Sequence, residues 1–168
     1  MTHNLGTMKW TLAFLILSGA LLTAQQVPAT LQGKWVVKRE LPTRTISCWG
    51  EKEAQQVIGT EIEYTEDSFR WKDHTIHHPK ITVRRLTGDQ YHDEYSSPAS
   101  DGSQVDFTQL GIKSATAEQI EFGHPPAHVV SESSEIPGDV VLIKHHDAIV
   151  FSVCNVYFEA ERAQPRKR

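Results

Sequence analysis

The chain has 168 residues, of which 39% are hydrophobic and 23% are charged; this suits one globular domain and is too short for two. Lys and Arg number 17 against 21 Asp and Glu, giving a formal charge of −4, and these charges are spread along the chain. We therefore do not expect nucleic acid as a partner. The basic residues within 163–168 are interpreted as a disordered tail.

Residues 1–24 are typical of an export signal peptide. Lys9 supplies the positive start, residues 10–22 form the apolar stretch, and Thr23 and Ala24 provide small side chains for cleavage. The apolar stretch is shorter than the ~20 residues that a membrane-spanning helix needs, so we expect no membrane span after the signal is removed. The mature chain is predicted to be periplasmic or secreted, and monomeric.

Two cysteines, Cys48 and Cys154, remain in the mature chain. An exported protein meets an oxidising compartment in which thiols pair, so we predict one disulfide between them. Closing a loop of about a hundred residues stabilises a fold by roughly 4–5 kcal/mol in the chain-entropy model. The alternative is two free cysteines, with Cys154 partly buried.

The first element of the mature chain is a predicted strand over residues 31–38. Its apolar residues alternate, and it contains the pattern Gly33-x-Trp35. A short helix is predicted next, over residues 51–59, because Glu, Ala and Gln favour helix and Gly59 is a natural stop.

From residue 60 onward the apolar residues follow a period of two, as in half-buried antiparallel strands. Residues 75–78 are predicted to be a short edge strand stopped by Pro79, and a turn at Gly88 begins a return through residues 90–95. Residues 139–144 are apolar at odd and even positions, which predicts either a strand covered on both faces or a break in the alternation. The strands predicted after the helix are residues 60–64, 68–71, 75–78, 81–86, 90–95, 118–122, 139–144, 148–153 and 156–162.

Together these elements predict an all-β domain over residues 25–162. Its expected form is a closed or nearly closed antiparallel β-barrel of about 8–10 strands, with one short helix after the first strand. Closure requires the first strand to pair with the last. The cysteines agree with this pairing, because Cys48 follows the first strand and Cys154 immediately precedes the last. The same pairing sets Trp35 beside Arg162, whose guanidinium can then stack on the indole.

The Gly33-x-Trp35 strand, with Arg162 ending the last strand, resembles the lipocalin and fatty-acid-binding-protein superfamily, the calycins. In those barrels a Trp from the first strand closes one end of the cavity against a basic residue from a late strand. The predicted helix is similar to the cap that fatty-acid-binding proteins carry between their first two strands. The resemblance implies a barrel that binds a small hydrophobic or amphiphilic molecule.

The candidate ligand site is the barrel interior. Arg85 shares the predicted inward face of Ile81 and Val83, from which it could hold a ligand carboxylate or phosphate. The alternative is that aromatic side chains fill the barrel and Arg85 emerges at its rim. The residues predicted to bind the ligand are Trp35, Tyr64, Trp71, Arg85, Phe151 and Arg162.

Histidine is in excess, with nine in the chain. On a strand His74 and His78 would share one face, which makes them candidate ligands for zinc or copper. Two imidazoles fall short of the four ligands of a closed zinc site, although residues 145–147 (His-His-Asp) could complete one. The alternative is surface histidines on polar turns, and no other cofactor is predicted.

The sequence shows no catalytic constellation, so we predict a binding protein and not an enzyme. Residues 131–135 carry hydroxyls and carboxylates without the glycines of a nucleophile elbow. The alternative to a small-ligand barrel is a periplasmic or secreted protein-interaction module, such as a hydrolase inhibitor. Small bacterial protease inhibitors also use disulfide-bearing barrels that begin with a Gly-x-Trp strand. In that case residues 96–103 or 131–138 would contact a secreted partner protein.

Overall fold

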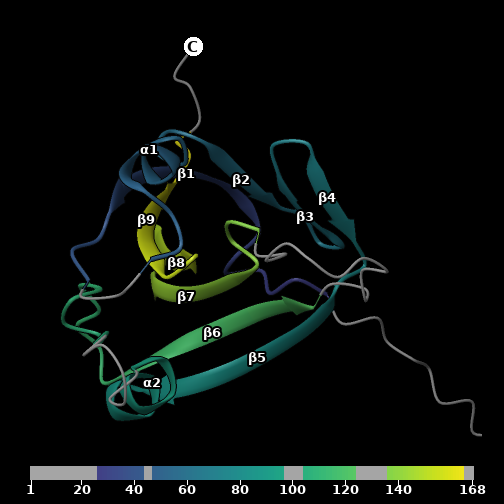
Figure 1. Ribbon diagram of the computed structural model, residues 1–168. Helices are drawn as coiled ribbons and strands as arrows, with labels where there is room; N and C mark the ends of the chain where they lie inside the picture. Colours follow the sequence, from purple (N-terminus) through teal and green to yellow (C-terminus); the bar gives the residue numbers. More distant parts are fainter. Residues whose placement is uncertain (1–25, 44–46, 97–103, 124–135, 165–168) are drawn as a thin grey trace, which may run out of the picture.

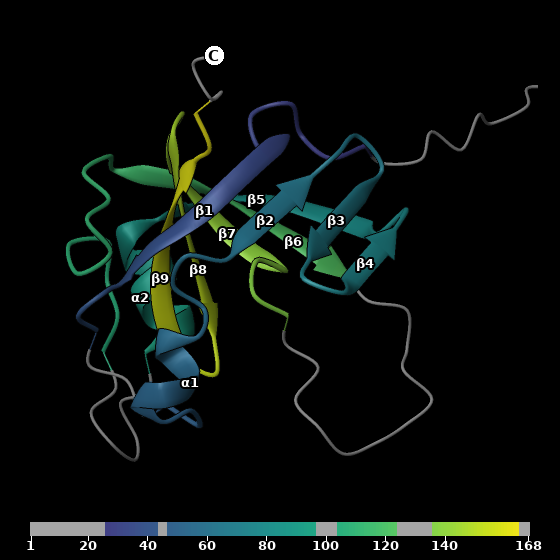
Figure 2. The same ribbon diagram turned by 90° about the horizontal axis from the view of Figure 1, so that it is seen from above.

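The computed structural model describes residues 26–43, 47–96, 104–123 and 136–164. In these ranges nine strands form one antiparallel sheet, in the order β4-β3-β2-β1-β9-β8-β7-β6-β5. The sheet curls so that β1 and β2 face β5 and β6 across the core (Figures 1 and 2). The strands are β1 (Gly33–Glu40), β2 (Glu61–Tyr64), β3 (Ser68–Trp71), β4 (His74–His77), β5 (Lys80–Thr87), β6 (Thr116–Gly123), β7 (Val140–His145), β8 (Ala148–Val153) and β9 (Val156–Arg162); the helices are α1 (Glu51–Gln55) and α2 (Gly88–Tyr95).

The first and last strands lie side by side, as the sequence predicts. They pair antiparallel, with Trp35 opposite Arg162 and Glu40 opposite Phe158. A β-bulge at Lys38 interrupts the register, which adds twist to the sheet at this point.

The expectation of a closed or nearly closed barrel is met in part, because the antiparallel sheet curls but does not close fully. In the part of the chain described, β4 and β5 are the two edges of the sheet and do not pair with each other. The reason lies between them: His78 has a left-handed φ of 47°, and Pro79 has no N–H to donate to a ladder. The chain turns a corner there, and β5 pairs antiparallel with β6 instead. The result is a curled half-barrel, open between β4 and β5 (Figure 1).

A hydrophobic core fills the concave side of the sheet. Its side chains come from alternate positions of all the long strands, and each large side chain removed from water there contributes roughly 1.5–3 kcal/mol. The largest members are Trp35, Ile62, Tyr64, Phe69, Ile81, Ile120, Phe122, Ile149, Phe151 and Phe158.

A second core covers part of the convex side, and the sequence did not lead us to expect it. It forms where α2 and residues 105–112 pack on the outward side chains of the sheet. The strand β7 serves both cores, because Val141 belongs to the first and Leu142 to the second. This confirms the prediction that residues 139–144 are covered on both faces.

The return strand predicted for residues 90–95 is wrong, because this segment is the helix α2. Thr87 begins it with a capping box: its side chain accepts from the Gln90 N–H, and the Gln90 side chain accepts from the Thr87 N–H. Tyr91 then lies buried against Phe107, with 5.5 Å between ring centroids. Local capping and this distant aromatic partner together outweigh the strand-like composition. Across the described ranges, neither helix has the length and apolar character needed to traverse a bilayer.

Candidate functional site

One end of the half-barrel is held by the predicted contact between Trp35 and Arg162. The guanidinium carbon lies 4.2 Å from the centroid of the indole. Its Nη1 donates to the carbonyl of Gln32 at 2.6 Å and its Nη2 to that of Thr30 at 2.8 Å, while the indole N–H donates to the Leu31 carbonyl at 2.7 Å. The pair therefore holds the segment before β1 across this end of the half-barrel.

The glycine of the Gly-x-Trp pattern has a steric role here. Gly33 has a φ of 123°, and a Cβ at this position would lie 2.8 Å from Nη1 of Arg162. Only glycine adopts this backbone readily and leaves room for the guanidinium. The pattern thus serves packing at the β1–β9 junction.

The other end of the same junction carries the predicted disulfide. Cys48 and Cys154 are bonded, with their Cα atoms 5.2 Å apart, and the N–H of Cys48 donates to the carbonyl of Cys154 at 3.3 Å. The described part of the chain contains no free cysteine, so no thiol is available there as a nucleophile.

Aromatic rings from opposite walls meet in the interior, where a ligand was expected. Tyr64 of β2, Phe69 of β3 and Phe122 of β6 stack on one another with centroids 5.3–5.5 Å apart. The Tyr64 hydroxyl donates to the carbonyl of Gly138 at 2.6 Å. Burial, with a contribution from the nearby Asp139, raises the pKa of Tyr64 well above its usual value, so the hydroxyl stays protonated and keeps this bond. Side chains occupy the space between the walls at this level.

The remaining predicted ligand residues do not gather at one site. Phe151 is buried and stacks on Phe158 at 5.4 Å. Trp71 is half-buried, and its indole N–H donates to the Thr60 hydroxyl at 3.1 Å. Arg85 and Val83 keep the predicted face of β5, the one that carries the buried Ile81, because β5 pairs with β6 in regular register. Both side chains are nevertheless exposed: Val83 is 42% exposed, and Arg85 donates to the Thr116 hydroxyl at 3.1 Å. This agrees with the alternative in which Arg85 emerges at the rim, because no described strand lies beyond β5.

The two candidate metal ligands also lie apart in the strand. His74 begins β4 and stacks on Trp71, with centroids 6.2 Å apart. His78 follows the end of β4, and its N–H donates to the carbonyl of Asp67 at 2.7 Å. Because the left-handed backbone of His78 breaks the strand alternation, the shared face predicted for the pair is wrong. Among the residues whose positions are described, no three His, Cys, Asp or Glu side chains are arranged to hold a metal ion.

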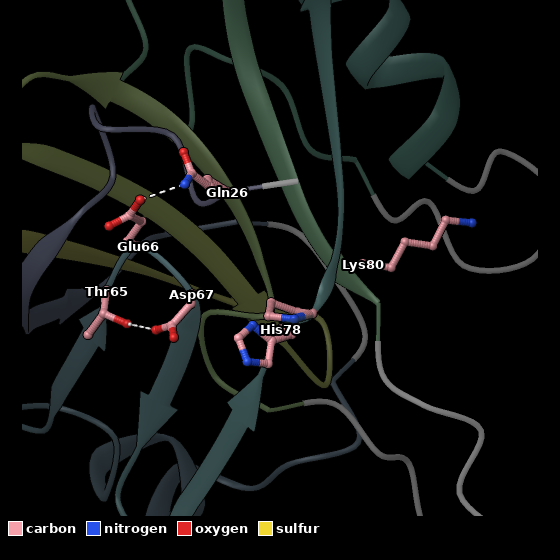
Figure 3. Close-up of a pocket in the computed structure, with 7 residues that line it drawn as sticks. Gln26, Thr65, Glu66, Asp67, His78 and Lys80 are labelled. Carbon is pink, nitrogen blue, oxygen red and sulfur yellow. Dashed lines mark hydrogen bonds between the residues drawn. The ribbon is translucent and has the colours of Figure 1, made fainter. Parts of the chain in front are cut away.

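A groove of about 590 Å³ lies at the open side of the sheet (Figure 3). It is lined by the turn between β2 and β3 and by the corner between β4 and β5. Four of the side chains that line the groove form two hydrogen-bonded pairs. Gln26 donates to Glu66 at 2.5 Å, and Thr65 donates to Asp67 at 2.9 Å. Lys80 projects away from the other labelled side chains. The residues that line the groove are Gln26, Thr65, Glu66, Asp67, His78, Pro79 and Lys80.

The sheet edge at β5 adjoins this groove through Lys80. β5 is eight residues long and pairs with β6 along its whole length, so its other edge is free among the described strands. We refer to the groove and this edge together as the open side. The sequence identified β5 as a strand, but no local signal could have told that it lies at an edge, because strand order depends on contacts distant in the chain.

In comparisons with known proteins, no protein-family model, curated protein or solved structure matches the chain. The loops in which the interaction hypothesis placed function, residues 96–103 and 131–138, lie almost entirely outside the described residues. The open side is therefore the candidate functional site that the described residues offer.

Proposed function

We propose that this chain is an exported, lipocalin-like half-barrel that acts by binding another protein at its open side. The observation that carries the proposal is the stack of Tyr64, Phe69 and Phe122, which fills the interior at the level where a small ligand would bind. Export is part of the proposal, supported by the signal-like residues 1–24 and by a disulfide that suits an oxidising compartment.

Binding to a protein suits the open side better than catalysis does. The groove is bounded by carboxylates already paired with an amide and a hydroxyl. A protein partner needs roughly 800 Å² of surface, and the groove with the adjoining eight-residue edge offers a continuous region on which such a surface can be built.

Photo-cross-linking in the exported fraction of the host tests this proposal. A photoreactive amino acid is placed at the position of Val83 or Glu66 on the open side, and at Lys38 or Lys52 as exposed controls elsewhere. We expect one exported protein to be cross-linked from the open side, saturably, and not from the control positions. Cross-links from the control positions alone, or none from any position, would overturn the proposal.

A small amphiphilic ligand is the second candidate, and the groove volume favours it. At about 590 Å³ the groove falls within the 300–1,000 Å³ range of small-molecule sites. Native mass spectrometry of the freshly purified chain separates the two candidates. The protein-binding proposal expects the mass of the chain alone, whereas a retained small molecule, lost on substituting Glu66 by Lys, would support the second.

A further inference from the structure

The two edges of the sheet differ in how they are protected against pairing with another strand. β4 has four residues and ends at the left-handed His78 and Pro79, which are common ways of blunting an edge. β5 has eight residues, pairs with β6 in unbroken register and contains no proline and no bulge. An edge of this length and regularity is a template for one more strand.

The side chains of β5 select what could pair with it. The strand contains Lys80, Arg84 and Arg85 and no acidic residue. Arg84 is neutralised by Glu94 at 2.7 Å, so its charge is satisfied within the chain. Lys80 and Arg85 are exposed, with neither in a salt bridge to a described residue. Val83, between them, is the one large hydrophobic side chain among the described residues that is strongly exposed.

A second copy of this chain is a poor occupant of the edge, because it would gather the basic side chains of both β5 strands in one interface. An acidic segment would instead place opposite charges beside the basic side chains of β5. The chain has a net charge of −4, so β5 is a basic edge on an acidic protein. Long-range attraction would orient an approaching acidic segment toward this edge.

We propose that β5 accepts an extended, acidic segment of a partner protein as a tenth strand of the sheet. Main-chain hydrogen bonds along β5 supply much of the affinity, acidic side chains lie near Lys80 and Arg85, and an apolar side chain covers Val83. This inference rests on the proposed function, and it names the partner chemistry and the place of contact.

The test uses a blocked eight-residue peptide of valine and glutamate, ordered so that an added strand places glutamate beside Lys80 and Arg85, which lie on opposite faces of β5, and valine beside Val83. The same peptide with lysine in place of glutamate is its charge-reversed valine–lysine control. We expect the acidic peptide to bind the full chain and to slow hydrogen exchange of β5 amides, leaving β4 amides unchanged. The double variant Lys80→Gln, Arg85→Gln should weaken it roughly tenfold. The matched variant Lys38→Gln, Lys52→Gln removes the same charge from exposed sites elsewhere and should have little effect.

Backbone methylation distinguishes strand addition from simple charge attraction. Methylating every second amide of the peptide, in each of two phases, removes the donors that a ladder needs, so we expect one phase at least to abolish binding. Equal binding of the methylated peptides, or of the valine–lysine control, overturns the inference. It is also overturned if the β5 amides that do not bond to β6 are already protected in the free chain, whether by a second copy or by another segment of the same chain.

Failure of this inference and failure of the proposed function give different results. If the Lys80→Gln, Arg85→Gln variant still cross-links the exported partner as wild type does, the partner binds elsewhere on the open side and the inference alone fails. If wild type cross-links no partner while the acidic peptide adds to β5, the edge is competent and the proposed function is what fails.

Discussion

The half-barrel is held together at two junctions, and different interactions stabilise each of them. Between β1 and β9 the junction is a ladder of main-chain hydrogen bonds, fastened by Arg162 at one end and by the disulfide at the other. Between the β2–β3 hairpin and β6 there is no ladder, and stacked aromatic rings span the gap. A backbone ladder tolerates changes of side chain, whereas a junction of rings depends on their volume. We therefore expect the first junction to be weakened by loss of the disulfide or of polar contacts. The second should be weakened by substitutions that reduce side-chain volume.

The largest effect is expected from removing the disulfide at the β1–β9 junction. The cysteines are 106 residues apart, so the double variant Cys48→Ala, Cys154→Ala should lose about 4–5 kcal/mol of unfolding free energy in the chain-entropy model. Urea unfolding at equilibrium measures this, and reduced wild type should match the variant. A loss below about 1 kcal/mol would mean that the ladder alone constrains the two strands.

Phe122→Ala should have the next largest effect, because it removes the ring that two residues of the opposite wall contact. A loss of about 3–4 kcal/mol is expected from the buried area and the cavity left behind. The control is Val83→Ala on the neighbouring strand, which removes a partly exposed side chain and should cost less than about 0.5 kcal/mol. Similar losses in both variants would show that the rings do not hold the second junction.

Arg162→Met should destabilise the chain by about 2 kcal/mol, since it removes charged hydrogen bonds to Gln32 and Thr30 together with the contact on Trp35. Hydrogen exchange of residues 27–32 should accelerate more than that of β6. Arg162→Lys keeps the charge without the planar fork and should recover only part of the loss. Full recovery by lysine would argue that the charge alone matters.

The smallest effect concerns pH at the β1–β9 junction. Burial acts to raise the pKa of Glu159, but hydrogen bonds from Lys144 and Arg39 outweigh it and lower the pKa below the usual 4.5. The charged carboxyl therefore stabilises the fold above the unfolded-state pKa, and this contribution is lost as the pH falls through the lower folded-state value. Between about pH 6 and pH 3, unfolding free energy should fall less steeply in Glu159→Gln than in wild type.

Arg39→Gln is the matched variant for this pH prediction. It leaves Lys144 on Glu159, and the Arg39 side chain is 62% exposed, so water screens its interaction with the carboxyl. We expect this variant to keep most of the wild-type pH dependence, measured by urea unfolding at each pH. An unchanged pH dependence in Glu159→Gln would assign the acid sensitivity of the fold to other groups.

The sequence predicted the β1–β9 junction well because its signals are carried by few residues with strong preferences. Gly33, Trp35 and Arg162 mark the strand ends, and the cysteines add an independent constraint on the same pairing. The α2 segment was missed because its composition is weak and its fold depends on Thr87 as a cap and on Phe107, which is far along the chain. Of the predicted ligand residues, Trp35 and Arg162 contact each other as expected, whereas Arg85 lies on the predicted face of β5 but is exposed there.

What the sequence determined by itself is the alternation that makes strands, the turns that separate them and the chemistry of the closing pair, because each is a property of neighbouring residues or of two marked ends. The sequence also marked β4 as an edge through its short length and Pro79, whereas the tertiary structure decided that β5 became the other edge. It also decided that aromatic rings fill the interior, and that Val83 and Arg85 face solvent. Those outcomes depend on strand order and on the volumes of side chains that meet across the core. The sequence pattern of a strand is the same whether or not another strand pairs with its second edge.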